Sequence, residues 1–182
     1  MPDYPENDES LLQAAGSGNM EAFEELVRRH QGWAWQITYR FFGEKEQAAD
    51  VVQDAFIRLL QASPRYQPRA KFRTYFHRII TRLCLDQAKK KRLPELDTVP
   101  DIFDPAPDAA AELMRRETAA AVRNALDTLA PNQRMAIVLR YYEGLDYREI
   151  ANAMGITPKA VERLLARGRK RLVAVLQEQK KS

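Results

Sequence analysis

The sequence is poor in the residues that build disulfides, metal sites and tight turns. It has one cysteine, Cys84, two histidines and seven glycines in 182 residues. A single cysteine excludes an internal disulfide and is typical of a reducing compartment. The sequence also lacks alternating β-branched runs, apolar runs of membrane-spanning length, and an apolar core in its acidic start, MPDYPENDES. We therefore expect an all-α cytoplasmic protein without membrane insertion, metal or cofactor.

Hydrophobic residues make up 45% of the chain, which is enough for one or two small domains. The net charge of +4 conceals a strong segregation of charge. Residues 65–92 hold ten Lys and Arg against one acid, residues 159–182 hold eight against two acids, and the remainder carries −11. Two separate basic segments predict two contacts with a polyanion.

The segment 93–112, LPELDTVPDIFDPAPDAAAE, has four prolines, six acids and no base. Prolines at this density prevent a regular helix or strand over most of its length. Its composition fits an ordinary solvated linker, and also fits a strand of acidic chain that lies in a basic channel of a partner. We predict a two-domain protein in which an N-terminal helical domain, 1–92, is joined by linker 93–112 to a C-terminal helical domain, 113–182.

The segment 146–172, DYREIANAMGITPKAVERLLARGRKRL, predicts a helix-turn-helix. Asp146 and Glu149 have the spacing of a capping box, which starts the first helix. Gly155 supplies the left-handed residue that ends this helix, and Thr157 caps a second helix with Pro158 at its first position. This geometry presents the second helix to a DNA major groove.

The second helix of this motif has an apolar stripe that includes Val161, Leu165 and Gly168, where glycine indicates a close helix contact. The neighbouring face is basic. A basic face can simply be solvated, but the helix-turn-helix favours DNA contact. The residues predicted to contact duplex DNA are Arg148, Thr157, Lys159, Ala160, Arg163, Arg167 and Lys170.

The segment 65–92 interleaves aromatic rings, which all fall within 66–76, with basic side chains. Bases of single-stranded nucleic acid stack on aromatic rings while arginines hold phosphates, so the segment predicts strand binding. The alternative is that Phe72, Tyr75 and Phe76 are core residues, which is the better interpretation for Phe76; His77 is expected to be a polar surface or hydrogen-bonded group. The predicted strand-binding residues are Arg65, Lys71, Phe72, Arg73, Tyr75, Arg78 and Arg82.

Apolar periodicity predicts helices through most of the remaining chain. The expected ranges are 9–15, 19–30 continuing through 31–42, 44–61, 70–91, 110–129 and 131–142, with a loop over 63–72.

Three segments together resemble the extracytoplasmic-function group of bacterial RNA polymerase sigma factors. They are ADVVQDAFIRLL at 49–60, FRTYFHRIITRLCLD at 72–86, and residues 126–172, which contain the helix-turn-helix. Many regulators share a helix-turn-helix, so the first two segments make the resemblance specific.

The resemblance implies a role for each segment. The helix at 49–60 would dock on the polymerase clamp through Asp50, Gln53 and Asp54, although these residues alone would fit a solvated face. Residues 65–82 would bind the non-template strand of the minus-ten element, with an extruded base held by loop 65–71. The helix-turn-helix would read the minus-thirty-five element, and the linker would enter the active-site and RNA-exit channel.

The resemblance further implies core RNA polymerase and promoter DNA as partners, an anti-sigma protein, a monomeric free chain and no catalysis. This chain has Tyr75, Phe76 and His77 where many relatives have Trp-Leu-Tyr, so base preference does not carry over. The recognition helix also departs from the common pattern, with Lys159 and Arg163 as the best remaining base-reading residues.

Two other classes of function are considered. A stand-alone helix-turn-helix regulator would bind duplex DNA as a dimer, but leaves the segments at 49–60 and 72–86 unexplained. A DNA-processing enzyme would need a nucleophile or metal cluster, which His30, His77, Cys84 and the scattered acids do not form.

Overall fold

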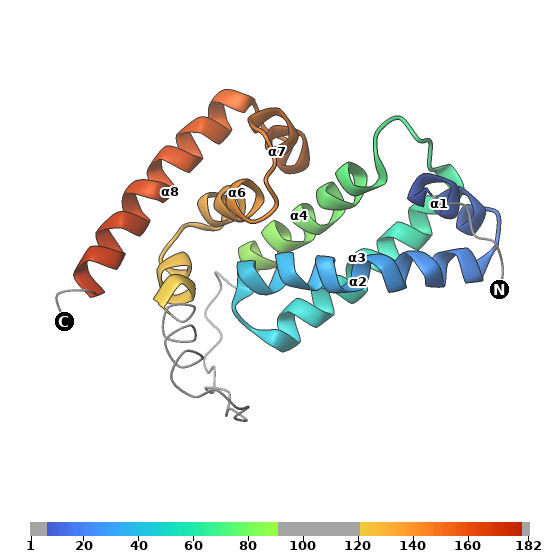
Figure 1. Ribbon diagram of the computed structural model, residues 1–182, viewed down its shortest axis with the longest axis horizontal. Coiled ribbons are helices and arrows are strands. Elements are labelled where there is room, and N and C mark those ends of the chain that lie inside the picture. Colours follow the sequence, from blue (N-terminus) through green and yellow to red (C-terminus); the bar gives the residue numbers. More distant parts are fainter. Residues whose placement is uncertain (1–6, 91–120, 180–182) are drawn as a thin grey trace.

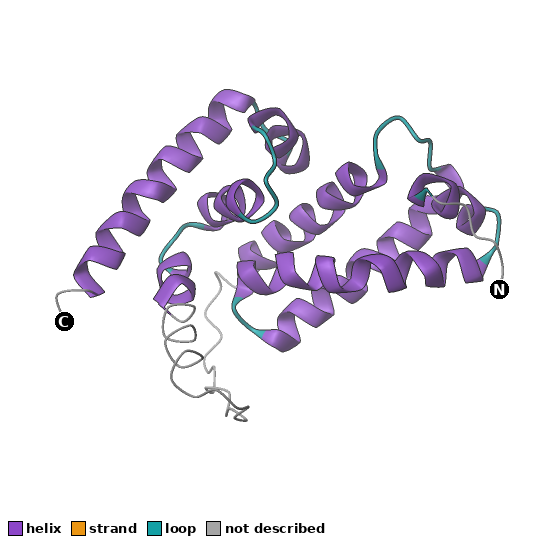
Figure 2. Cartoon of the chain, in the orientation of Figure 1, coloured by secondary structure: helices purple, strands orange, loops and turns teal. Residues whose placement is uncertain are grey.

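The computed structural model describes residues 7–90 and 121–179, and every regular element in these ranges is helical (Figures 1 and 2). The all-α, two-domain prediction is confirmed. The elements are α1 (Asp8–Gly16), α2 (Met20–Phe42), α3 (Lys45–Ala62), the 3-10 turn η1 (Ser63–Arg65), α4 (Phe72–Lys90), a helical stretch over 121–127, α6 (Pro131–Tyr141), α7 (Tyr147–Met154) and α8 (Pro158–Gln179). No helix in the described ranges is long and apolar enough to cross a membrane.

The N-terminal domain is a bundle of α1 to α4, and side-chain caps fix where its first helices begin. Asn7 accepts a hydrogen bond from the Ser10 N–H at the start of α1, and Asn19 accepts one from the Ala22 N–H at the start of α2. Such caps each contribute about 1 kcal/mol. Gly43 ends α2 with a φ of 76°, a conformation that glycine adopts without strain.

Aromatic side chains fill the centre of this bundle. The Phe56 ring from α3 lies 5.0 Å from Phe76 on α4 and 6.3 Å from Phe23 on α2, in tilted and edge-on arrangements. Phe72 continues the cluster 5.5 Å from Phe76. Because each buried Phe contributes roughly 1.5–3 kcal/mol, this cluster is a main source of the domain's stability.

In the C-terminal domain α8 packs against both α6 and α7, and α6 and α7 also touch one another. Residues 135–139 of α6 are all buried, so this helix is covered on every side over more than one turn. The predicted close contact at Gly168 is confirmed: a Cβ atom there would lie 3.1 Å from Ile137 Cγ1.

The two domains contact one another, with α4 against α7 and α6, and α2 against α6 (Figure 1). Arg134 of α6 donates a hydrogen bond of 2.8 Å to the carbonyl oxygen of Phe41 at the end of α2. Thr81 of α4 lies with its hydroxyl 3.9 Å from the sulfur of Met135. The predicted linker 93–112 and the domain boundaries at its ends fall outside the described residues.

Candidate polymerase and nucleic-acid interfaces

The helix-turn-helix forms as its sequence predicts. Asp146 accepts hydrogen bonds from the N–H groups of Arg148 and Glu149, and Glu149 accepts one from the Asp146 N–H, which completes the capping box. Gly155 ends α7 with a φ of 67°. Thr157 then caps α8 by accepting a hydrogen bond of 3.2 Å from the Ala160 N–H. These local bonds fix where α7 and α8 begin.

The basic residues of α8 point away from the C-terminal core. Val161, Leu165 and Gly168 are buried against the domain. At about 100° per residue, Arg167 lies within roughly 40° of Arg163 and on the side opposite this buried stripe. Along the helix-turn-helix the exposed predicted DNA contacts are Arg148, Thr157, Lys159, Arg163, Arg167 and Lys170, and Ala160 is half-buried.

The predicted strand-binding segment divides into core and surface. Arg65, Lys71, Arg73, Arg78 and Arg82 are exposed, and Tyr75 is half-buried. Tyr75 lies with its ring 5.2 Å from Tyr66, a residue of loop 66–71 that the strand-binding prediction did not name.

Phe72 requires a correction. Its ring is 1% exposed and packs 4.6 Å from the His30 ring, so in this structure it belongs to the core and is not offered to a base. The reason is helical spacing: Phe72 shares the buried stripe of α4 with Phe76 and Ile80. The rest of α4 divides into a buried stripe with Phe76 and Ile80 and an exposed face with Arg78 and Arg82.

A groove of about 330 Å³ lies between α4 and α7. On α4 its charged lining residues are Arg78, Arg82, Lys89 and Asp86, and the other wall is formed by the end of α7 at Ala153 and Met154 and by Gly155 after it. The Arg82 side chain is 80% exposed, so the charge on this wall of the groove is open to solvent. The basic face of α4 thus shares a groove with the first helix of the helix-turn-helix.

The outer face of α3 carries two acids, with one base, Arg58, exposed one turn after Asp54. Asp50, Gln53 and Asp54 are exposed, while Val52, Phe56 and Leu59 on the other side of the helix are buried. Ile57 is also exposed, at 45%. An apolar side chain beside two carboxylates is suited to a protein surface that carries both apolar and cationic groups.

The sequence gives no signal for Glu143, which lies at the contact between the domains. Glu143, in the turn after α6, has a side chain only 5% exposed, and its Oε2 accepts a hydrogen bond of 2.7 Å from the Trp33 indole N–H. Arg40 lies 3.6 Å from the other carboxylate oxygen. His77 Nε2 lies 3.5 Å from Oε2, at the long limit for a hydrogen bond.

Burial opposes ionisation of the Glu143 carboxyl, but the neighbouring His77, Trp33 and Arg40 outweigh it and lower its pKa. His77 itself is buried, at 4% exposure, rather than on the surface, and its ring lies edge-on to Trp33 at 4.7 Å. Trp33, Arg40 and His77, all far from Glu143 in sequence, thus surround its carboxylate. This cluster exists only because the two domains pack together.

Two family models match the chain. The family model "Sigma-70 region 2" matches residues 26–93, and "Sigma-70, region 4" matches residues 119–172. The first match contains α3 and α4, and the second contains the helix-turn-helix.

Several sigma factors are similar to this chain over most of its length. The ECF RNA polymerase sigma factor SigE of Mycolicibacterium smegmatis is 34% identical over 84% of this chain and 61% of its own length. RNA polymerase sigma factor CnrH of Cupriavidus metallidurans is 32% identical over 94% of this chain and 96% of its own. A solved structure of CnrH in complex with the cytosolic domain of CnrY matches with a TM-score of 0.69, at 31% identity, over 94% of this chain and 97% of that one. The sigma factor RpoE, solved with the anti-sigma factor NepR from Bartonella quintana, has the same fold at 18% identity, with a TM-score of 0.62 over 85% of this chain and 96% of that one.

Proposed function

Because the chain belongs to the extracytoplasmic-function group of sigma factors, the promoter-recognition subunits of bacterial RNA polymerase, we propose that its three exposed surfaces divide this task. The outer face of α3 binds core polymerase. The basic face of α4 with loop 66–71 captures the minus-ten strand, and α7 with α8 reads the minus-thirty-five duplex. The protein supplies recognition in the bacterial cytoplasm and leaves catalysis to the polymerase.

The observation that carries this proposal is the separation of charge between α3 and α4. The two helices pack against one another through Phe56 and Phe76, yet α3 exposes Asp50 and Asp54 while α4 exposes Arg78 and Arg82. One small bundle therefore presents an acidic surface and a basic surface at once. The acidic surface fits a protein that carries arginines, and the basic surface fits a nucleic acid.

Strand capture by α4 would combine stacking and phosphate binding. Tyr75 is half-buried on α4, between the exposed Arg73 and Arg78 in sequence, and stacking of one base on such a ring contributes roughly 1–3 kcal/mol. Unstacking a base costs a few kcal/mol, so contacts in loop 66–71 must supply the remainder for opening to be favourable. Phe72 stays in the core and is left out of this site.

An anti-sigma protein is the expected regulator. CnrH was solved with the cytosolic domain of CnrY, and RpoE with the anti-sigma factor NepR. We propose that this chain has a partner of the same kind, one that covers the polymerase-binding face of α3.

The first experiment is size-exclusion chromatography of the protein with bacterial core RNA polymerase, at moderately high salt to suppress non-specific binding. The wild type should co-elute with the polymerase, and Asp54→Lys should not. Glu24→Lys, which makes the same charge change at an exposed position of α2, serves as the matched control and should co-elute.

Co-elution of both variants would show that α3 is not the docking helix. Failure of the wild type to co-elute, with duplex binding retained, would instead favour a stand-alone regulator.

A further inference from the structure

Helix α1 lies outside the segment that matches the sigma-70 region 2 model, which begins at residue 26. It nevertheless contacts the chain on both sides of loop 66–71. We propose that α1 is a brace that holds this loop in shape for strand capture, and that Glu9 is its positioning residue. This inference rests on the proposed function, because it assigns α1 a role in the strand capture proposed for α4.

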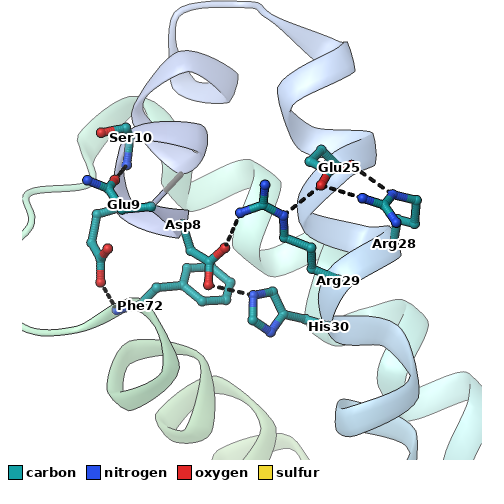
Figure 3. A network of polar contacts seen from close by, with 9 residues as sticks. Asp8, Glu9, Ser10, Glu25, Arg28, Arg29, His30 and Phe72 are labelled. Atoms are coloured by element: carbon teal, nitrogen blue, oxygen red, sulfur yellow. Dashed lines mark hydrogen bonds and ion pairs between the residues drawn. The ribbon is translucent and has the colours of Figure 1, made fainter. Parts of the chain in front are cut away.

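The first contact is at the end of the loop, where α4 begins. The backbone N–H of Phe72, the first residue of α4, donates a hydrogen bond of 2.5 Å to Glu9 Oε1 (Figure 3). The first N–H groups of a helix have no partner within the helix, and a carboxylate there also interacts favourably with the helix dipole. Glu9 thus caps α4 from a helix 63 residues away in sequence.

The second contact is at the start of the loop. Gly16, the last residue of α1, lies against the 3-10 turn η1 so closely that a Cβ atom at this position would collide with the carbonyl group of Ser63. The turn η1 ends at Arg65, directly before loop 66–71. The two ends of α1 therefore meet the two ends of the loop.

Asp8 anchors the brace itself. Its carboxylate lies 2.7 Å from His30 Nε2 and 3.2 Å from an Arg29 nitrogen, which ties α1 to α2 (Figure 3). The ring of His30 packs in turn on Phe72. Two neighbouring acids of α1 thus hold different helices, with Asp8 fixed to α2 and Glu9 fixed to α4.

The rings that would meet a base lie close to this cap. Tyr66 stands 5.2 Å from Tyr75, and its hydroxyl is buried without a hydrogen-bond partner. Burial, and then the negative charge of Glu9, raise the pKa of Tyr66 and keep it neutral. If the loop moved at Phe72, where Glu9 holds it, the surroundings of Tyr66 and Tyr75 would change together.

The test uses holoenzyme assembled from core polymerase and each variant, on a promoter selected with the wild-type holoenzyme from a random library. Strand opening is followed by permanganate reactivity of minus-ten thymines. Exchange of backbone amides in residues 66–76 is measured on the free protein. The variants are Glu9→Ala, Glu9→Gln, Tyr75→Ala and the control Glu24→Ala.

Glu9→Ala should slow opening roughly five- to tenfold, as expected for the loss of one charge-assisted cap, and should speed exchange at Phe72. Polymerase affinity should be unchanged. Glu9→Gln keeps an oxygen acceptor and should restore most of both properties, and Glu24→Ala should match the wild type.

Several results would overturn the inference. One is opening by Glu9→Ala at the wild-type rate. A second is a loss of polymerase affinity as large as the loss of opening, because a general structural role would lower both. A third is recovery of exchange protection by Glu9→Gln without recovery of opening. If Tyr75→Ala opens promoters normally, the proposed strand capture by α4 is wrong; if Tyr75→Ala is defective and Glu9→Ala is not, only the brace is wrong.

Discussion

The carboxylate of Glu143 and the indole N–H of Trp33 join the two domains by a hydrogen bond of 2.7 Å between residues 110 positions apart. Arg73 stacks over the same indole, with its guanidinium carbon 4.6 Å from the ring centroid. Arg73 and Trp33 belong to the N-terminal domain, where Arg73 is a predicted strand-binding residue. In this conformation the Glu143–Trp33 hydrogen bond holds the helix-turn-helix domain beside the proposed strand-binding face of α4.

Glu143→Ala should loosen this contact. A hydrogen bond to a charged group contributes about 1.5–3 kcal/mol, and its loss leaves the Trp33 N–H without its acceptor. We expect a larger radius of gyration in small-angle X-ray scattering and a shift in tryptophan fluorescence. Glu143→Gln, which keeps an acceptor, should have a smaller effect, and Glu162→Ala on the exposed side of α8 should have none. Identical scattering from Glu143→Ala and the wild type would show that the contact does not hold the domains together.

Gly168→Ala should change the free energy of unfolding in opposite directions depending on whether residue 137 is isoleucine or alanine. Gly168→Ala gains about 1 kcal/mol in helix propensity, but its Cβ would lie 3.1 Å from Ile137 Cγ1, and overpacking of this kind costs roughly 1–3 kcal/mol. We therefore expect net destabilisation in the wild type. In an Ile137→Ala background the obstacle is gone, and Gly168→Ala should stabilise the protein. Urea unfolding of the double-mutant cycle measures both values, and additive effects would contradict the explanation.

The helix-turn-helix could be predicted from the sequence almost residue by residue. Its capping and turn residues contact partners no more than four residues away, so local spacing alone determines where the helices begin and end. These residues are Asp146, Glu149, Gly155 and Thr157. The same holds for the buried stripe of α8. Periodicity likewise predicts the aromatic core, because a helix repeats every 3.6 residues.

Contacts that depend on packing between helices could not be predicted in this way. Glu9 and Glu143 look like ordinary surface acids in the sequence, and only the fold brings Phe72 to one and Trp33 to the other. Phe72 was assigned both to the core and to base stacking, because an aromatic residue at the edge of a basic segment fits either role. Its neighbour His30, 42 positions earlier, decides the matter in favour of the core.

Cys84 should be unreactive in the folded protein. It is completely buried on α4, and burial raises the pKa of its thiol far above the ordinary value, while the thiolate is the reactive form. Reaction with a chromogenic disulfide at pH 8 should therefore be slow and should follow the rate of unfolding. A fast reaction that is independent of denaturant would show that the N-terminal core opens locally near Cys84.

Acid should weaken the pairing of Glu25 with two arginines of α2. Hydrogen bonds from Arg28 and Arg29, at 2.6–2.8 Å, lower the pKa of Glu25 from 4.5 to about 2. Because the folded pKa is the lower one, the stabilising contribution is fully present above pH 4.5 and is lost as the pH falls toward 2. The difference in melting temperature between the wild type and Glu25→Gln should shrink over this range and at high salt. A constant difference would show that the pair does not persist in solution.

Arg163 and Arg169 form a matched pair on α8, since both are exposed but they lie about 120° apart around the helix. Arg163 shares the outward face with Lys159 and Arg167, whereas Arg169 lies to one side. Arg163→Ala should weaken binding to the minus-thirty-five duplex and lose discrimination at one base position, by roughly 1–3 kcal/mol if it contacts a guanine. Arg169→Ala should leave base preference unchanged and at most reduce the salt dependence. Competition binding against duplexes with single-base changes, at fixed salt, measures both effects. Uniform weakening by Arg163→Ala across all duplexes would instead assign this arginine to the phosphate backbone.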